Sequence, residues 1–104
     1  PKNYDIFCYL KKNIKQIALT KSNNLGFLKK FNLPKIKKRS KKNKDWKFLC
    51  NYKNSISNKK LNINLYYKFS SKIPSKYHWY YLNKNNDFIP TFTKKIFKQV
   101  SNLY

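Results

Sequence analysis

The sequence predicts a small α+β protein that forms a single domain over residues 1–104 and has little core of its own. Apolar residues recur at three- and four-residue steps near both ends, and they alternate with polar residues over 61–69. A formal charge of +22 on 104 residues opposes compaction. We therefore expect N-terminal helices over 1–33, an extended basic segment over 35–47, a two-stranded hairpin over 46–69 and a helix over 91–103.

The first predicted helix runs from residue 5 to residue 20. Its apolar positions share one helical face and are Phe7, Leu10, Ile14, Ile17 and Ala18. Asp5 is its expected N-cap, and the Ser and Asn cluster at 22–24 is expected to end it. A shorter helix over 25–31 would stop before Leu33-Pro34, because the residue before a proline is pushed out of the helical region.

Residues 35–47 are mostly basic, and such a run repels itself and stays extended until it meets an anion. A solvated linker is the alternative interpretation. Trp46 favours binding, because a large aromatic ring after a block of charge can stack on a base or anchor the segment.

Two strands are predicted to follow, over 46–52 and 61–69, joined through the polar stretch from Asn54 to Lys60. The second has the clearest strand pattern in the sequence, because its apolar residues alternate with Asn, Tyr and Lys. An isolated hairpin is marginal in water, so this one should lean on the helices or on a partner.

Five residues with aromatic rings stand in a row from Tyr77 to Tyr81. Alternate members can enter a core or contact a protein neighbour. In the other interpretation a tyrosine or His78 stacks on an unpaired base. Beyond them, Thr91 or Thr93 can cap a C-terminal helix whose apolar face comprises Phe92, Ile96, Val100 and Leu103.

The excess of positive charge requires a polyanionic partner, either nucleic acid or an anionic membrane. Catalysis is not expected, because the acidic and imidazole groups Asp5, Asp45, Asp87 and His78 are scattered and no nucleophile has a base beside it. Cys8 and Cys50 lack the spacing of a zinc site, so we expect no bound metal. We also expect no cofactor and no small-molecule substrate. The long basic segment and the Asn-rich turns present cations in several directions, as suits enclosure by folded RNA better than a flat membrane.

All but one of the 25 basic residues are Lys, and the abundance of Lys, Asn, Ile, Tyr and Phe indicates an A+T-rich gene. We therefore expect a structural, rRNA-binding protein of an organellar ribosome, above all a mitochondrial one, in contact with neighbouring ribosomal proteins. Another organelle with an A+T-rich genome is the alternative location. Two other classes stay open, a supernumerary subunit of an organellar membrane complex and a DNA-packaging protein.

The order of landmarks resembles the family of the fourteenth small-subunit ribosomal protein in its organellar, zinc-free form. Leu33-Pro34 followed by basic residues, a basic residue before Cys50, Phe69-Ser70-Ser71-Lys72-Ile73 and the stretch 89–97 are similar to that family's motifs. The Gly-Arg turn that follows the family's Cys is absent here. The resemblance implies a helical N-terminal half and a place in the head of the small subunit, on the 3′ domain of its rRNA.

The residues expected to bind RNA are mainly those of the basic segment, which would neutralise phosphates, together with aromatic rings that would stack or pack. They are Lys35, Lys37, Lys38, Arg39, Lys41, Lys42, Lys44, Trp46, Lys47, Lys72, Tyr77, His78, Lys94 and Lys95.

Overall fold

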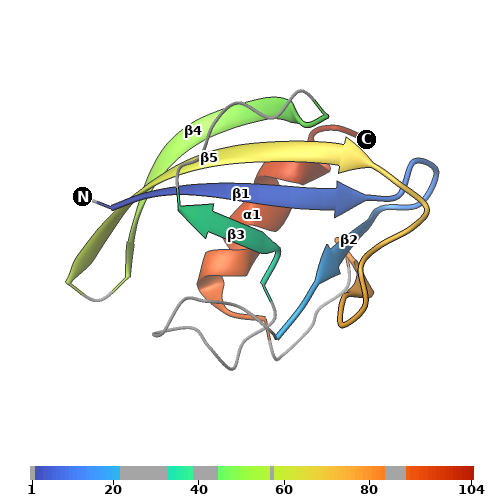
Figure 1. The fold of residues 1–104 in the computed structure, drawn as a ribbon. Helices are drawn as coiled ribbons and strands as arrows, with labels where there is room; N and C mark the ends of the chain where they lie inside the picture. The colour runs from blue at the N-terminus through green and yellow to red at the C-terminus, as the bar shows by residue number, and fades with distance from the viewer. Residues whose placement is uncertain (1, 22–32, 39–44, 57, 84–88) are drawn as a thin grey trace.

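In the part of the chain that the structure describes, six strands form one sheet and one helix packs across one of its faces (Figure 1). The computed structural model describes residues 2–21, 33–38, 45–56, 58–83 and 89–104. Along the chain the elements are β1 (Lys2–Leu10), β2 (Gln16–Leu19), β3 (Lys35–Lys38), β4 (Lys47–Ile56), β5 (Lys59–Phe69), β6 (His78–Tyr81) and α1 (Thr91–Ser101).

The strand β1 lies at the centre of the sheet, whose order is β4-β5-β1-β2-β6. Along one edge β1 pairs in parallel with β5 over its whole length, from Lys2 opposite Leu61 to Leu10 opposite Phe69. Two antiparallel strands share its other edge: β3 lies opposite Tyr4 to Phe7, and β2 begins its pairing opposite Leu10. A strand with neighbours on both edges and a helix below it has most of its side chains buried, as Tyr4 to Cys8 are.

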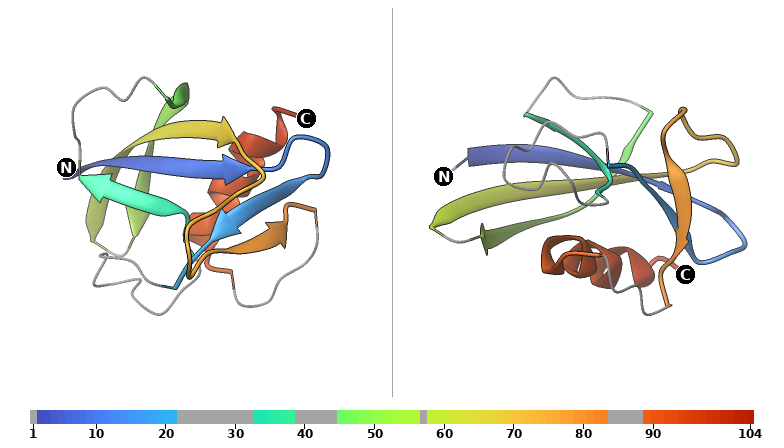
Figure 2. Two further views of the ribbon diagram at one scale, coloured as in Figure 1. Left: turned by 45° about the vertical axis from the view of Figure 1, so that its right-hand side comes forward. Right: turned by 90° about the horizontal axis from the view of Figure 1, so that it is seen from below.

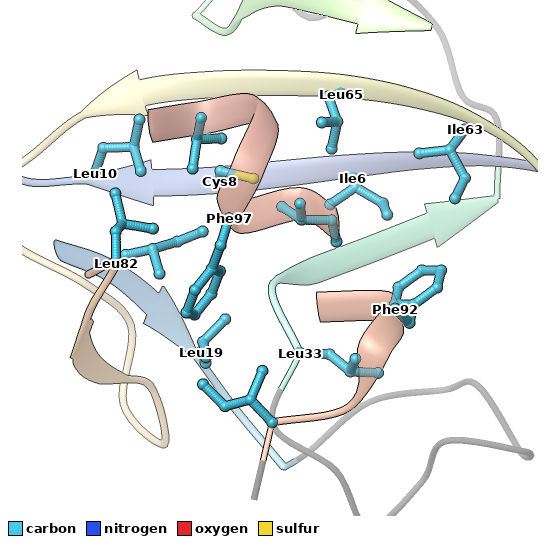
Figure 3. Packing of buried hydrophobic residues seen from close by; sticks show 14 of the residues in the cluster. Ile6, Cys8, Leu10, Leu19, Leu33, Ile63, Leu65, Leu82, Phe92 and Phe97 are labelled. Atoms are coloured by element: carbon cyan, nitrogen blue, oxygen red, sulfur yellow. The ribbon is translucent and has the colours of Figure 1, made fainter. Parts of the chain in front are cut away.

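The core lies between the sheet and α1, as Figure 2 shows in its right-hand view. In Figure 3, Ile6, Cys8 and Leu10 of β1 face the same space as Ile63 and Leu65 of β5, and Phe92 and Phe97 of α1 close it. Each fully buried side chain of this size contributes about 1.5–3 kcal/mol relative to an exposed one. The expectation of little independent core is therefore wrong.

The predicted N-terminal helices are wrong. Residues 5–20 form most of β1, a turn and β2, and the shorter helix predicted over 25–31 lies outside the described residues. The three- and four-residue spacing has another origin: it combines apolar residues of two consecutive strands, β1 and β2. Asp5 is a strand residue and not a helix N-cap; it is only 3% exposed and accepts a hydrogen bond from Asn64.

The antiparallel pair and the C-terminal helix are present, with different boundaries. β4 continues to Ile56 and β5 begins at Lys59, so most of the predicted loop over 54–60 is paired strand. The helix begins after Pro90, which is its N-cap and gives no side-chain hydrogen bond, so neither Thr91 nor Thr93 is the cap. Of the basic segment, residues 35–38 form β3, and residues 39–44 lie outside the described residues.

Candidate nucleic-acid interface

The face of the sheet opposite α1 carries polar and aromatic side chains instead of aliphatic ones. Side chains alternate between the two faces of a strand. Since Leu61, Ile63 and Leu65 face the helix, the residues between them in β5 face the other way, and the same holds for β1. The β1–β5 register then sets four pairs side by side on this second face: Asn3 with Asn62, Asp5 with Asn64, Phe7 with Tyr66, and Tyr9 with Lys68.

Amide side chains form a ladder across one half of this face. The Asn51 amide donates to Asn62 Oδ1 at 3.0 Å and to Asn64 Oδ1 at 2.7 Å. Asn62 donates to Asn3 Oδ1 at 2.9 Å, and Asn64 donates to Asp5 Oδ1 at 3.2 Å. The ladder joins β4, β5 and β1 and fixes the directions of their side chains, because each amide has both a donor and an acceptor to satisfy.

The other half of the face carries a continuous series of aromatic rings, here called the aromatic stripe. Ring centroids of consecutive members lie 4.9–6.0 Å apart, a range that favours stacked and edge-to-face pairs. The stripe crosses from β4 through β5 and β1 to the residue before β6, and its members are Phe48, Tyr66, Phe7, Trp46, Tyr9 and Tyr77.

Phe7 is the floor of the stripe, and the other rings are more open to solvent. Phe7 is 5% exposed beneath Trp46 and Tyr66, whereas Phe48 is 57% exposed at the β4 end. A phenol at its ordinary pKa is already uncharged at neutral pH. Burial raises the pKa of Tyr77, and the nearby Tyr9 raises it further. Uncharged, partly exposed rings suit stacking against another flat ring.

Lysine side chains lie directly over rings of this face. The Nζ atom of Lys68 is 5.1 Å from the Trp46 ring and 5.9 Å from the Tyr9 ring. Lys11 lies 5.0 Å over Trp79 of β6, which pairs with Ala18 in β2. Each such contact is worth about 0.5–1 kcal/mol at an exposed site. It also places a cation beside an aromatic surface. A nucleotide complements both, because its phosphate can pair with the cation and its base can stack on the ring.

The structure brings only some of the predicted RNA-binding residues to this face. Trp46 and Tyr77 belong to the aromatic stripe, and Lys35 lies in β3 opposite Phe7. The backbones of Lys37 and Lys38 pair with those of Asp5 and Tyr4. The remaining cations of the basic segment lie outside the described residues and are Arg39, Lys41, Lys42 and Lys44.

The other predicted residues are spread over the molecule. Lys47 begins β4 and His78 begins β6, both exposed, and Lys72 is exposed in the loop after β5. Lys94 and Lys95 are exposed on α1, and Lys95 donates a 2.9 Å hydrogen bond to Asn54. The helix lysines therefore lie across the core from the aromatic stripe.

Sequence reasoning missed most of the stripe and the whole amide ladder. The missed stripe residues are Phe7, Tyr9, Phe48 and Tyr66, with Lys68 beside them. The signal available was the set of residues between the apolar ones in 61–69, which are themselves amides, an aromatic ring and a lysine. An aromatic residue at one of these positions indicates that the second face of the strand is more than a solvated surface.

No protein-family model and no curated protein sequence matches this chain. In the part of the chain that the structure describes, no helix is long and apolar enough to cross a membrane. Among the same residues no three metal-ligating side chains of His, Cys, Asp or Glu come together. Among the described residues the fold is a sheet with a helix on one face and with aromatic rings and lysines on the other.

Proposed function

We propose that the chain is a structural RNA-binding protein of an organellar, in the first place mitochondrial, ribosome, and that it holds folded rRNA against the helix-free face of its sheet. The observation that carries the proposal is the aromatic stripe with Lys68 over two of its rings, in a chain of net charge +22.

The combination is informative because charge and rings contribute different things. Lysine neutralises phosphates and releases counterions, which supplies affinity without sequence preference. Aromatic rings on a sheet stack unpaired bases, at about 1–3 kcal/mol per base. A lipid surface offers no flat partner for the rings, and a paired duplex hides its bases in the stack. Folded RNA with unpaired loops supplies both partners.

Exposed lysines occur on both sides of the molecule, including Lys53 on β4 and Lys94 and Lys98 on α1. That distribution fits a protein surrounded by RNA, as in a ribosome, better than one lying on a plane. The narrower assignment to the small subunit rests on the sequence resemblance alone. The fold gives it no support, since β1 and β2 occupy the region for which the resemblance implied helices.

The test measures binding of a folded rRNA fragment over a series of salt concentrations. Affinity should fall steeply, by about a thousandfold or more between about 50 and about 200 mM salt if six or more lysines contact phosphates. Lys68→Ala should reduce the salt slope by roughly one phosphate contact. Lys98→Ala, which removes an exposed charge from α1, is the matched control and should change the slope less. A slope near zero for the unmodified protein would overturn the proposal.

Co-sedimentation separates the rival functions. A ribosomal protein should follow rRNA and shift after ribonuclease treatment, whereas a subunit of a membrane complex would pellet with lipid after the same treatment. A DNA-packaging protein would be displaced from RNA equally well by duplex DNA of the same length.

A further inference from the structure

A hollow of about 410 Å³ lies at the edge of the sheet where the parallel strands β1 and β5 both end. Figure 1 shows the two strands ending at this edge and the loops that follow them extending beyond it. The turn after β1 contributes Lys11, Lys12 and Ile14, and the end of β5 contributes Phe69 and Ser71. The volume lies in the range of small-ligand sites.

Hydrogen bonds hold both walls of this hollow. The Ser70 amide donates to the Leu10 carbonyl at 2.9 Å, which continues the β1–β5 pairing past the end of β5. The turn after β1 is closed by the Gln16 amide, which donates to the Ile14 carbonyl at 2.7 Å. The Tyr104 hydroxyl donates to the Lys11 carbonyl at 2.6 Å and so ties the last residue to the same turn. The hollow is therefore formed before any ligand arrives.

The lining combines an open aromatic ring with cations. Phe69 is 39% exposed although Tyr67 and Tyr104 contact its ring at centroid distances of 5.9 Å and 6.0 Å. Ile14 is 46% exposed at the tip of the turn. Lys12 is exposed at the rim, and Lys11 is partly buried beside it. A ligand that fits needs a flat apolar part and an anionic group.

We propose that this hollow holds one unpaired nucleotide of the bound RNA, with its base against Phe69 and its phosphate beside Lys12. The inference rests on the proposed RNA binding and adds the kind of RNA that is recognised: a strand with an extruded nucleotide, not a continuous duplex. The aromatic stripe is an open surface that tolerates many strands, whereas a concave site admits a single base. A nucleotide is favoured over a lipid because the ring is flat and the flanking charge on the turn is dense.

The experiment compares two RNAs of equal length, one a single strand and one fully paired, by fluorescence anisotropy at fixed salt. Phe69→Leu keeps apolar volume and removes the ring, so affinity for the single strand should fall about fivefold while affinity for the duplex is unchanged. Lys12→Ala should weaken single-strand binding more than Lys60→Ala, a matched control on an exposed lysine at the other end of β5.

A photo-reactive thiouridine in the single strand locates the base. The expected cross-links lie within residues 11–14 or 69–71. Normal, salt-dependent binding of both RNAs with no effect of Phe69→Leu, or cross-links only at the aromatic stripe, would overturn this inference and leave the proposed function standing. If the unmodified protein binds neither RNA, both fail. Binding to vesicles of anionic lipid that is lost in Phe69→Leu, with RNA binding unchanged, would assign the hollow to a membrane instead.

Discussion

The two faces of the sheet are built from the same strands but have opposite chemistry. On β1 and β5 the helix side holds Ile6, Ile63 and Leu65, all fully buried. The opposite side holds amides, aromatic rings and Lys68, at positions displaced by a single residue. One strand thus serves two purposes, because its side chains alternate in direction. The comparison teaches that stability and binding should respond to different residues, even to immediate neighbours in the sequence.

Thiol labelling tests whether the helix side of the sheet is closed. Cys8 and Cys50 both lie on that side, because Cys8 is a core residue and Cys50 pairs with Leu65 and contacts Gln99 of α1. Burial raises the pKa of the Cys8 thiol, with a further increase from Cys50, and burial also raises the pKa of Cys50, which is only half-buried. Because the thiolate is the reactive form, Cys8 should react only when the chain unfolds, at least about a thousandfold more slowly than an unfolded thiol. Mass spectrometry of alkylated peptides measures both rates. Equal rates for the two residues would show that the helix side is not closed.

Substitution of adjacent residues in β5 sharpens the comparison. Ile63→Ala leaves a cavity under α1 and should lower the free energy of unfolding by about 2–5 kcal/mol. Asn62→Ala, one residue away on the other face, removes amide hydrogen bonds worth about 0.5–1.5 kcal/mol each. Urea unfolding followed by tryptophan fluorescence gives both values. If Asn62→Ala proved the more damaging, the second face would be part of the core.

The smallest expected effect concerns binding by the second face. Phe48→Ala removes the most exposed ring of the aromatic stripe and should weaken the binding of single-stranded RNA by about 1–3 kcal/mol. Phe97→Leu, a buried ring on α1, is the control and should leave RNA affinity unchanged. Anisotropy titrations at one salt concentration measure both. Equal losses in the two variants would remove the distinction between the faces.

A strand with one buried face could be predicted from the sequence, whereas a strand with two buried faces could not. β5 was recognisable because its two faces differ and its apolar residues alternate. β1 is central, and both its faces are largely buried over Tyr4 to Cys8, so its pattern does not alternate. Its apolar residues merged with those of β2 into a spacing that a helix also produces.

The candidate site was only partly predictable for a different reason. Trp46 and Tyr77 were predictable from local sequence, because Trp46 follows the basic segment and Tyr77 begins a run of five residues with aromatic rings. Phe7 and Tyr66 are 59 positions apart, and only the parallel β1–β5 register makes them neighbours. A contact of that kind has no trace in local sequence, because nothing near Phe7 specifies which strand will lie beside it.

The parallel pairing of β1 with β5 also bears on how the protein is made. During synthesis β1 emerges with both edges unpaired, and the edge that β5 covers stays open until residues 61–69 have been translated. Unpaired strand edges invite association between nascent chains. The surplus of lysines makes such chains repel one another, so the charge that would attract RNA to the finished molecule would also protect the unfinished one from aggregation.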